Sequence, residues 1–201
     1  MNVQFWFDPA CPWCWVTSRW LDDVADKRGF EVDWQPISLL FKNEPDPDSE
    51  YYDGVVGTHG MLRVVEATRA AGHEARIGRL YTALGRRIHD EGTSDFAVQD
   101  ALREADLPEE LAAAKDDPSW DEQIRTRMQV GLDLVGDDVG TPIIAVDGPD
   151  GGRVGLFGPV ISQRPTGQAA LDLWDGFVQM VAVPGFWELK RTRTEGPQLP
   201  A

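Results

Sequence analysis

Basic residues, cysteine and long apolar runs are all scarce in this chain of 201 residues. Lysine and arginine number 19 against 34 aspartates and glutamates, which leaves a formal net charge of −15. A protein that binds nucleic acid or an anionic membrane needs a basic surface, so we expect neither as a partner. The longest charge-free apolar stretch, from Gly176 to Trp187, is twelve residues long. A bilayer-spanning helix needs about 20 apolar residues, so none is predicted.

The N-terminal residues, Met1 to Gln4, lack the basic region and the small-residue cleavage site that mark a secretory signal. The length suits one domain, or one domain that carries a sizeable insertion. We therefore expect a soluble, cytoplasmic protein.

Only two cysteines occur, and they lie three residues apart in the sequence Cys11-Pro12-Trp13-Cys14. A disulfide stabilises a fold most when it closes a long loop, and this one would close a minimal loop. A structural zinc site usually needs four ligands, and the three histidines, His59, His73 and His89, supply no zinc-binding spacing. We predict no metal site. A redox-active dithiol is the interpretation that remains.

The residues around the dithiol predict a strand, a helix and a second strand. Residues 3–7 form a short β-rich run, residues 12–27 carry apolar side chains at helical spacing, and residues 30–38 are β-rich again. Cys11 then lies at the N-cap of the helix and Cys14 one turn inside it. This places the dithiol at the junction between a strand and a helix.

A loop and a block of helices are expected next. Residues 40–49 are rich in proline and aspartate, which predicts a loop. Apolar residues then recur at helical spacing in four stretches between Tyr51 and Gly136, with no strand signal among them. Ser119 and Glu122 have the spacing of a capping box at the start of the last of these helices. We expect this block to be an all-helical insertion.

The C-terminal part returns to β character. Strands are predicted at residues 141–146 and 153–157, and a helix at residues 166–181. The tail from Pro184 reads as irregular and carries a basic patch, Lys190 to Arg193, in an otherwise acidic chain. This patch either binds an acidic group or pairs with surface carboxylates.

The order of these elements resembles the DsbA-like branch of the thioredoxin superfamily. That branch has Cys-x-x-Cys at the start of its first helix, a helical insertion, and Thr or Val before a cis-proline, which Thr141-Pro142 matches here. The resemblance implies a thioredoxin-like α/β fold, with residues 1–50 and 137–201 forming the thioredoxin-like domain and residues 51–136 the inserted helical domain.

Eight segments are also similar to the actinobacterial mycothiol-dependent nitroreductase family. This similarity implies a cytoplasmic, reducing enzyme that mycothiol recycles as a co-substrate, that holds no tightly bound cofactor, and that reduces disulfides or nitro compounds. Monomer and homodimer both stay open. The segments are Phe5–Pro9, Cys11–Trp15, Thr17–Trp20, Leu80–Ala83, Arg87–His89, Val139–Pro142, Phe157–Pro159 and Glu188–Thr194.

Cys11 is the predicted nucleophile, because the amides and dipole at a helix N-terminus favour a thiolate there. The dipole contributes at most about 2 kcal/mol, or about 1.5 pKa units, and Asp8 and the neighbouring aromatic residues oppose it. We therefore expect a moderately acidic thiol that is suited to reduction. In this mechanism Cys11 attacks a disulfide or an activated electrophile, and Cys14 resolves the mixed species.

Six residues are candidates for binding the substrate. Trp13 offers a flat surface for an aromatic substrate beside the thiol. Cis-proline at Pro142, which the resemblance implies, would present the Thr141 backbone to an extended substrate. The full set is Pro12, Trp13, Asn43, Tyr51, Thr141 and Pro142.

Two of these candidates, and two histidines that are not among them, each have an ordinary structural alternative. Asn43 and Tyr51 fall where the pocket residues of the resembled family would lie, but a loop amide and a helix-start aromatic are equally expected there. His59 and His89 either line a cleft between the two units or are ordinary solvated or core residues.

Two other functions stay open. A kappa-type thiol transferase or isomerase on the same fold would use the thiol as a reactant and would not need a second cysteine, so Cys14 argues against it. A non-catalytic acidic binding module would carry a vestigial dithiol.

Overall fold

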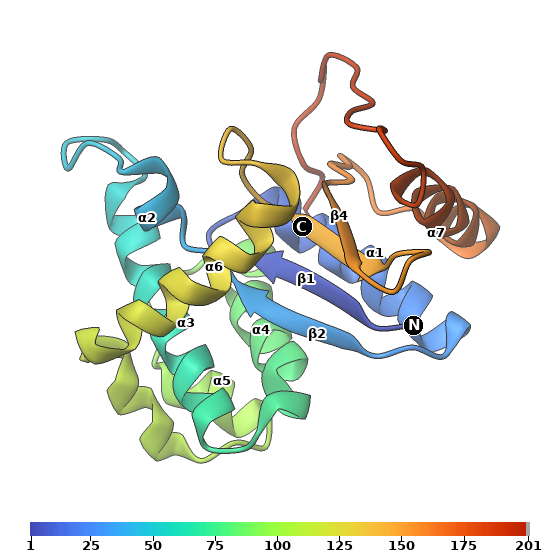
Figure 1. Cartoon of the computed structure of the whole chain (residues 1–201). Coiled ribbons are helices and arrows are strands. Elements are labelled where there is room, and N and C mark those ends of the chain that lie inside the picture. Colours follow the sequence, from blue (N-terminus) through green and yellow to red (C-terminus); the bar gives the residue numbers. More distant parts are fainter. Residues whose placement is uncertain (200–201) are drawn as a thin grey trace.

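The structure, a computed structural model, describes residues 1–199; the last two residues of the predicted irregular tail lie outside this range. A four-stranded sheet with the order β2-β1-β3-β4 lies at its centre (Figure 1). β1 runs parallel to β2 and antiparallel to β3, and β3 is antiparallel to β4. The strands are β1 Val3–Phe7, β2 Val32–Pro36, β3 Ile143–Asp147 and β4 Arg153–Phe157.

Helices and the irregular segments that connect them make up the rest of the described chain, and the helices within residues 51–136 form the predicted helical block. Within the described part of the chain, no helix combines the length and the apolar character that crossing a membrane would require. The main helices are α1 Pro12–Arg28, α2 Leu39–Asn43, α3 Tyr52–Ala70, α4 Ile77–Gly85, α5 Val98–Glu104, α6 Asp121–Val135 and α7 Gly167–Val181; the short ones are η1 Glu74–Arg76, η2 Arg86–Asp90, η3 Glu109–Asp116 and η4 Pro118–Trp120.

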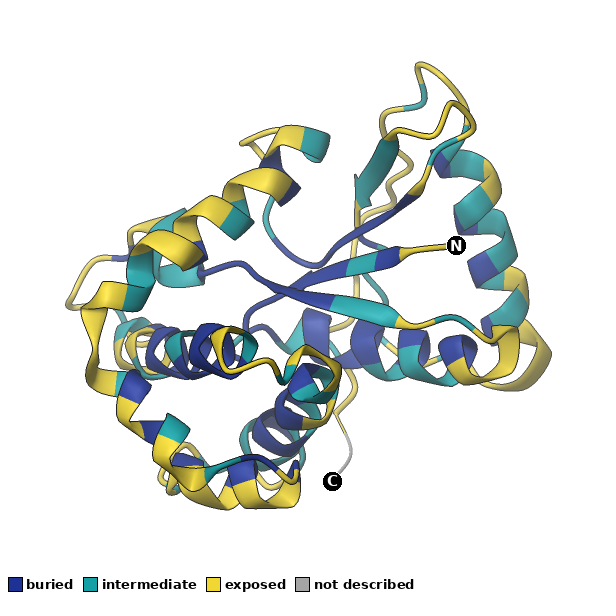
Figure 2. Cartoon of the chain, turned by 60° about the horizontal axis from the view of Figure 1, so that its bottom comes forward, coloured by how far each residue is buried: buried dark blue, intermediate teal, exposed yellow. Residues whose placement is uncertain are grey.

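Alternating side chains of β1 point into two separate cores, because successive residues of a strand face opposite sides of the sheet. Phe5 and Phe7 lie on the side of α1 and α4, where the ring of Phe7 stacks on Tyr81 at 4.0 Å between centroids. Trp6 lies on the opposite side and donates from its indole nitrogen to the backbone carbonyl of Arg127 in α6, at 2.9 Å. The two central strands, β1 and β3, are therefore mostly buried, whereas the edge strand β4 is half-buried to exposed along its length (Figure 2).

The helical block ends in a helix that packs on the sheet. α3 packs on η3 and α4 on α5, whereas α6 lies against β2, β3 and β4. The division into residues 1–50 and 137–201 on one side and 51–136 on the other stays a prediction. The packing of α6 favours an insertion that ends before Asp121.

The predicted loop at residues 40–49 was partly wrong, because α2 begins at Leu39. Two side chains supply the hydrogen bonds that a helix start needs. The hydroxyl of Ser38 accepts the amide of Phe41 at 3.3 Å, and the carboxylate of Asp8 accepts the amide of Leu39 at 2.7 Å. The second of these bonds joins residues 31 positions apart, which a local pattern does not reveal.

The predicted capping box of Ser119 and Glu122 does not form. Ser119 lies inside η4, and the carboxylate that accepts its amide, at 2.9 Å, belongs to Asp117. α6 then follows directly from η4 with no side-chain cap at its N-cap residue, Trp120. The turn of 3₁₀-helix before α6 moves the N-cap by one residue, from Ser119 to Trp120.

Candidate active site

Cys11 is the N-cap residue of α1. Its Sγ accepts the backbone amide of Cys14 at 3.4 Å, and its thiol donates to the carbonyl of Thr141 at 3.7 Å. The residue is 5% exposed, so the approach to the sulfur is narrow. Pro12 occupies the first position of the helix, where the missing N–H removes no helical hydrogen bond.

Cys14 lies one turn inside α1 and is fully buried. Its Sγ is 2.8 Å from the hydroxyl of Thr141, which in turn donates to the carbonyl of Trp6 at 2.9 Å. Either group can donate in this contact: the thiol when Cys14 is protonated, and the Thr141 hydroxyl when Cys14 is ionised. The peptide bond between Thr141 and Pro142 is cis, as the resemblance implies. Both cysteines are free thiols.

The two thiols have pKa values shifted in opposite directions. A hydrogen bond from the Cys14 thiol lowers the pKa of Cys11 below its ordinary value, and the amides of Cys14 and Trp13 add to this, while burial and the charge of Asp8 oppose it. Burial raises the pKa of Cys14 well above its ordinary value, and its bond to Cys11 raises it further. The arrangement therefore suits one nucleophilic thiolate with a protonated thiol behind it.

Asp8 is a fully buried carboxylate beneath the dithiol loop. Its two oxygens accept the amides of Ala10 and Leu39 at 2.8 and 2.7 Å. Burial is the largest influence on it and raises the pKa of Asp8 to about 6, despite these bonds. At neutral pH its negative charge raises the pKa of Cys11. The sequence predicts a negative charge three residues before Cys11. That Asp8 is buried follows from the packing of α2 and could not be predicted from the sequence.

Trp13 is half-buried at the start of α1, and a residue from the far end of the chain covers it. The guanidinium of Arg193 lies over the Trp13 ring, 5.1 Å from its centroid. This contact brings one residue of the predicted basic patch to a side chain that lies between the two cysteines in the sequence. No local sequence signal connects the two segments.

His89 is buried and supports the backbone just before the dithiol. Its Nε2 bonds to the carbonyl of Pro9 at 2.8 Å, and its ring stacks on Trp15 at 5.9 Å between centroids. The indole of Trp15 donates to Asp90 at 2.7 Å. Burial lowers the pKa of His89, so its ring is neutral at neutral pH. These contacts agree with the interpretation of His89 as a core residue.

His59 is also buried, in a chain of hydrogen bonds that joins three elements. Its Nδ1 lies 2.9 Å from the hydroxyl of Ser38, and its Nε2 lies 3.0 Å from the carboxylate of Asp121. Asp121 in turn accepts two bonds from Arg63. Burial lowers the pKa of His59. Ser38 is fully buried, so this Ser-His-Asp chain links α2, α3 and α6 and presents no nucleophile.

Asn43 and Tyr51 flank the segment between α2 and α3. Asn43 ends α2, and Tyr51 is the N-cap residue of α3 with 54% of its surface exposed. Neither side chain is hydrogen-bonded to Cys11 or Cys14 within residues 1–199. Their predicted role in binding substrate stays a prediction.

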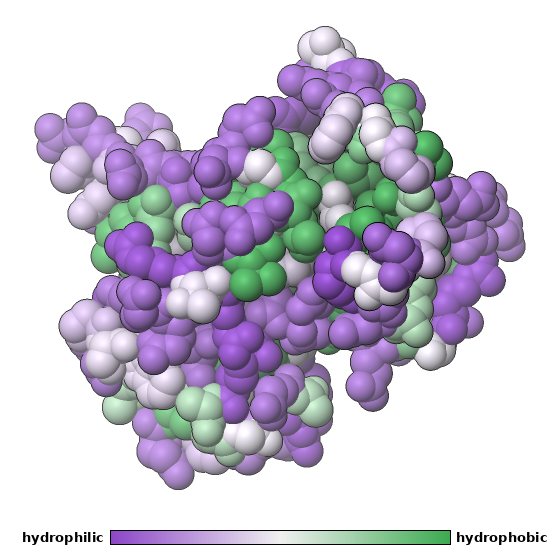
Figure 3. Space-filling model, viewed as in Figure 1, coloured by the Kyte–Doolittle hydropathy of each residue, from purple (hydrophilic) through white to green (hydrophobic). Residues whose placement is uncertain are grey.

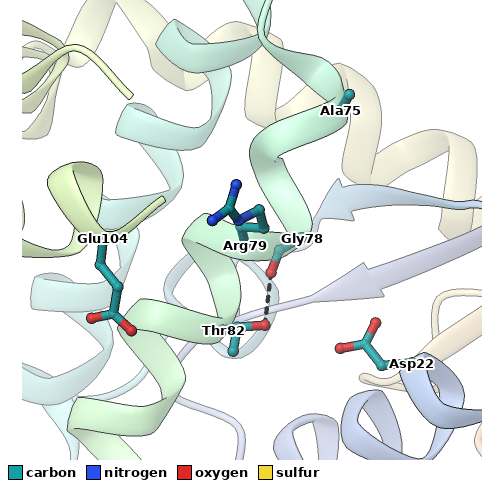
Figure 4. Close-up of a pocket in the computed structure, with 6 residues that line it drawn as sticks. All are labelled: Asp22, Ala75, Gly78, Arg79, Thr82 and Glu104. Carbon is teal, nitrogen blue, oxygen red and sulfur yellow. Dashed lines mark hydrogen bonds between the residues drawn. The ribbon is translucent and has the colours of Figure 1, made fainter. Parts of the chain in front are cut away.

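A separate cavity of about 430 Å³ lies between α1, α4 and α5. Asp22, on its rim, lies eleven residues beyond Cys11, about 16 Å along the helix axis. Figure 4 shows that the hydroxyl of Thr82 is turned back to the carbonyl of Gly78, at 2.8 Å. The lining residues are Asp22, Ala75, Gly78, Arg79, Thr82 and Glu104, and none of them is a predicted site residue.

No group of three or more histidine, cysteine, aspartate and glutamate side chains is placed to hold a metal ion in the part of the chain that the structure describes.

Known proteins resemble the chain over nearly its whole length. A model of the Rv2466c-like family, described as mycothiol-dependent nitroreductase Rv2466c, matches residues 10–191. The uncharacterized protein Rv2286c of Mycobacterium tuberculosis is 31% identical over 200 residues, which cover 96% of this chain and 83% of that relative. The family match spans the dithiol, the helical block and α7, so it does not depend on a short motif.

Solved structures show the same fold. The match to the cytosolic disulfide reductase DsbM of Pseudomonas aeruginosa covers 89% of this chain and 97% of DsbM, with 17% sequence identity and a TM-score of 0.56. The structure of DsbM with GSH has 16% identity to this chain and a TM-score of 0.57. The match to the oxidoreductase DsbA of Xylella fastidiosa covers 89% of this chain and 85% of DsbA, with 17% sequence identity and a TM-score of 0.51. At these identities the likeness confirms the predicted thioredoxin-like, DsbA-like fold with its helical insertion.

Proposed function

The chain belongs to the Rv2466c-like family of mycothiol-dependent nitroreductases, and from this premise we propose that it is a cytoplasmic thiol-disulfide oxidoreductase that works through Cys11 and Cys14. The geometry of the two thiols carries the proposal: Cys11 caps α1 and accepts the amide of Cys14 at 3.4 Å, and Cys14 is buried one turn behind it. The opposite directions of their pKa shifts agree with this geometry. A thiolate is the nucleophile in thiol–disulfide exchange, and the attacking thiol works best when its pKa is near the ambient pH.

With a disulfide substrate, the Cys11 thiolate attacks one sulfur and releases the other as a thiolate. Cys14 then loses its proton, attacks Sγ of Cys11, and releases the second substrate thiol. The substrate gains two electrons and two protons, and the protein holds the Cys11–Cys14 disulfide. Thr141 lowers the barrier to the second step, because its hydrogen bond favours the ionised form of Cys14.

With a nitro compound, the same two electrons and two protons convert the nitro group to a nitroso group and one water, and the dithiol becomes a disulfide. Two molecules of mycothiol then return the protein to the dithiol and leave as the mycothiol disulfide. The family assignment supports mycothiol as the donor. DsbM, which has been solved with GSH, supports a low-molecular-weight thiol as the class of partner.

The function is tested by steady-state reduction of a nitroaromatic and of a small disulfide. Mycothiol, glutathione and thioredoxin are compared as donors at equal thiol concentration, with the Cys11→Ser variant as the control. We expect turnover with mycothiol and only background turnover in Cys11→Ser. Turnover with glutathione alone would refute the mycothiol assignment, and full turnover in Cys11→Ser would refute the dithiol mechanism.

Cys14→Ser separates this function from a transferase that needs only one cysteine. We expect this variant to accumulate a mixed disulfide between Cys11 and mycothiol, which intact-mass measurement detects, and to lose multiple turnover. Wild-type rates in Cys14→Ser would favour the kappa-type transferase or isomerase.

A further inference from the structure

Hydrogen bonds connect the tail after α7 to a segment that is itself bonded to α1. The amide of Gln198 donates to the carbonyl of Ser162 at 2.6 Å, and the hydroxyl of Ser162 donates to the carbonyl of Glu195 at 3.2 Å. The segment that carries Ser162 is itself joined to α1, because the hydroxyl of Thr17 donates to the carbonyl of Pro159 at 2.9 Å. The tail thus leaves α7 and returns toward the middle of the molecule (Figure 1).

This course places the guanidinium of Arg193 over the ring of Trp13, which lies between the two cysteines in the sequence. A cation over an aromatic face contributes about 0.5–1 kcal/mol at an exposed site, so the contact fixes the guanidinium only loosely. Arg193 lies just beyond residues 10–191, the range that the family model matches.

Arg193 forms no ion pair with the part of the chain that the structure describes, although the chain is strongly acidic. Within residues 1–199, twelve of the arginines form ion pairs, and those that do not are Arg125, Arg191 and Arg193. Arg125 lies over the ring of Phe41, and within residues 1–199 Arg191 has no cation–π contact. No lysine or arginine occurs between Cys11 and Ser18. Arg193 therefore brings to the ring of Trp13 a cation that the start of α1 does not itself supply.

Hydrophilic residues cover most of the surface seen in Figure 3, and acidic side chains outnumber basic ones by 34 to 19. An unpaired guanidinium in such a surface attracts small anions to its own position, while the surrounding charge repels them elsewhere. Its planar set of N–H donors matches a group that carries two oxygens in one plane, such as a carboxylate or a nitro group.

We propose that Arg193 and the ring of Trp13 form the binding site for a flat aromatic substrate that carries a carboxylate or a nitro group. This inference rests on the proposed function and names its substrate class. The two oxygens of the substrate bind the guanidinium, and its ring packs beside Trp13 and the dithiol. When the group is a nitro group, reduction by the dithiol builds negative charge on those oxygens, and Arg193 stabilises that charge.

Binding is measured first, by titration calorimetry with 4-nitrobenzoate in a Cys11→Ser, Cys14→Ser background that transfers no electrons. We expect Arg193→Gln to raise Kd about fivefold to tenfold, Arg193→Lys to raise it less, and the matched control Arg191→Gln to change it less than twofold. A Kd in Arg193→Gln within twofold of the parent, or an equal rise in Arg191→Gln, overturns the proposal.

Turnover is measured second, with 4-nitrobenzoate and with the uncharged bis(2-hydroxyethyl) disulfide. We expect Arg193→Gln to lower the ratio of kcat/KM for the first substrate to that for the second by about fivefold to tenfold. An equal loss of kcat/KM on both substrates would show that Arg193 only supports the structure of the tail, and this result would overturn the proposal. If the wild type reduces neither substrate while the Kd difference persists, the proposed function fails and the binding site stands.

Discussion

The two sides of the dithiol are built in different ways. Beneath it, buried groups from distant segments meet: the hydroxyl of Thr141, the carbonyl of Trp6 and the carboxylate of Asp8. Above it, the tail is fixed by Ser162 and by the contact of Arg193 with Trp13, and its residues 187–195 are mostly exposed.

The difference separates two tasks. Buried hydrogen bonds set the pKa values of the thiols, because electrostatic interactions are stronger where water is excluded. We expect the exposed tail to contribute little to stability, because regions with few buried contacts open at low free energy. The comparison predicts that substitutions below the dithiol change stability and thiol chemistry, whereas those above it change selectivity.

The largest effect is expected from Asp8→Asn, measured as the dependence of unfolding free energy on pH. The pKa of Asp8 is about 6 in the folded protein against its ordinary value of 3.8, so the folded state binds more protons between these values. Asp8 therefore contributes stability that is present below about pH 4 and is lost as pH rises through about 6. In the wild type this loss of unfolding free energy amounts to about 3 kcal/mol, and in Asp8→Asn we expect no such loss over the same pH range.

Denaturant unfolding of both proteins from pH 4 to pH 8 checks this prediction, and parallel curves would contradict it. The same variant also removes the charge that raises the pKa of Cys11. We therefore expect Asp8→Asn to lower the pKa of Cys11, measured from the pH dependence of its alkylation rate. An unchanged or higher pKa would show that Asp8 does not act on the thiol.

Gly85→Ala tests the packing behind the dithiol. A Cβ at Gly85 would overlap the six-membered ring of Trp15, which is held by Asp90 and stacks on His89. Overpacking of this kind costs about 1–3 kcal/mol, and we expect a loss of stability in that range by denaturant unfolding. Gly176→Ala, in α7 with open space around it, is the matched control and is expected to lose nothing.

Thr141→Val removes the hydroxyl between Cys14 and Trp6 while keeping the shape of the side chain. We expect a loss of about 1–2 kcal/mol in unfolding free energy, because the carbonyl of Trp6 and the thiol of Cys14 lose a buried partner. The pKa of Cys14 rises further, because the lost bond lowers it. Thr141→Ser keeps the hydroxyl and should restore both properties; equal effects of the two substitutions would exclude this role.

The smallest effect on stability is expected above the dithiol, from Ser162→Ala. This change removes the bond to Glu195, and the unfolding free energy should stay within about 0.5 kcal/mol of the wild type. Trypsin should nevertheless cut faster after Arg191 and Arg193, as mass spectrometry of the fragments would show. If cleavage begins in the helical block in both proteins, the tail is not the less stable region.

The amino-acid sequence by itself determined the order of the elements and the place of the dithiol. Residues 3–7 were predicted to form a strand and do, and Cys11 is the N-cap residue of a helix that ends one residue beyond the predicted end. Such features are predictable because hydrophobic periodicity, proline and N-cap preference act within a few residues of the chain. Pro142 was assigned its cis bond by family resemblance, not by any local pattern.

Tertiary structure alone decided the surroundings of the two sulfurs. α2 begins where Asp8 accepts a distant amide, Thr141 reaches Cys14 across 127 positions, and Arg193 covers Trp13 from the far end of the chain. A single sequence carries no periodic signal for such contacts, because they arise when separate elements pack together. The same packing removes water from the site, and burial is what raises the pKa values of Asp8 and Cys14.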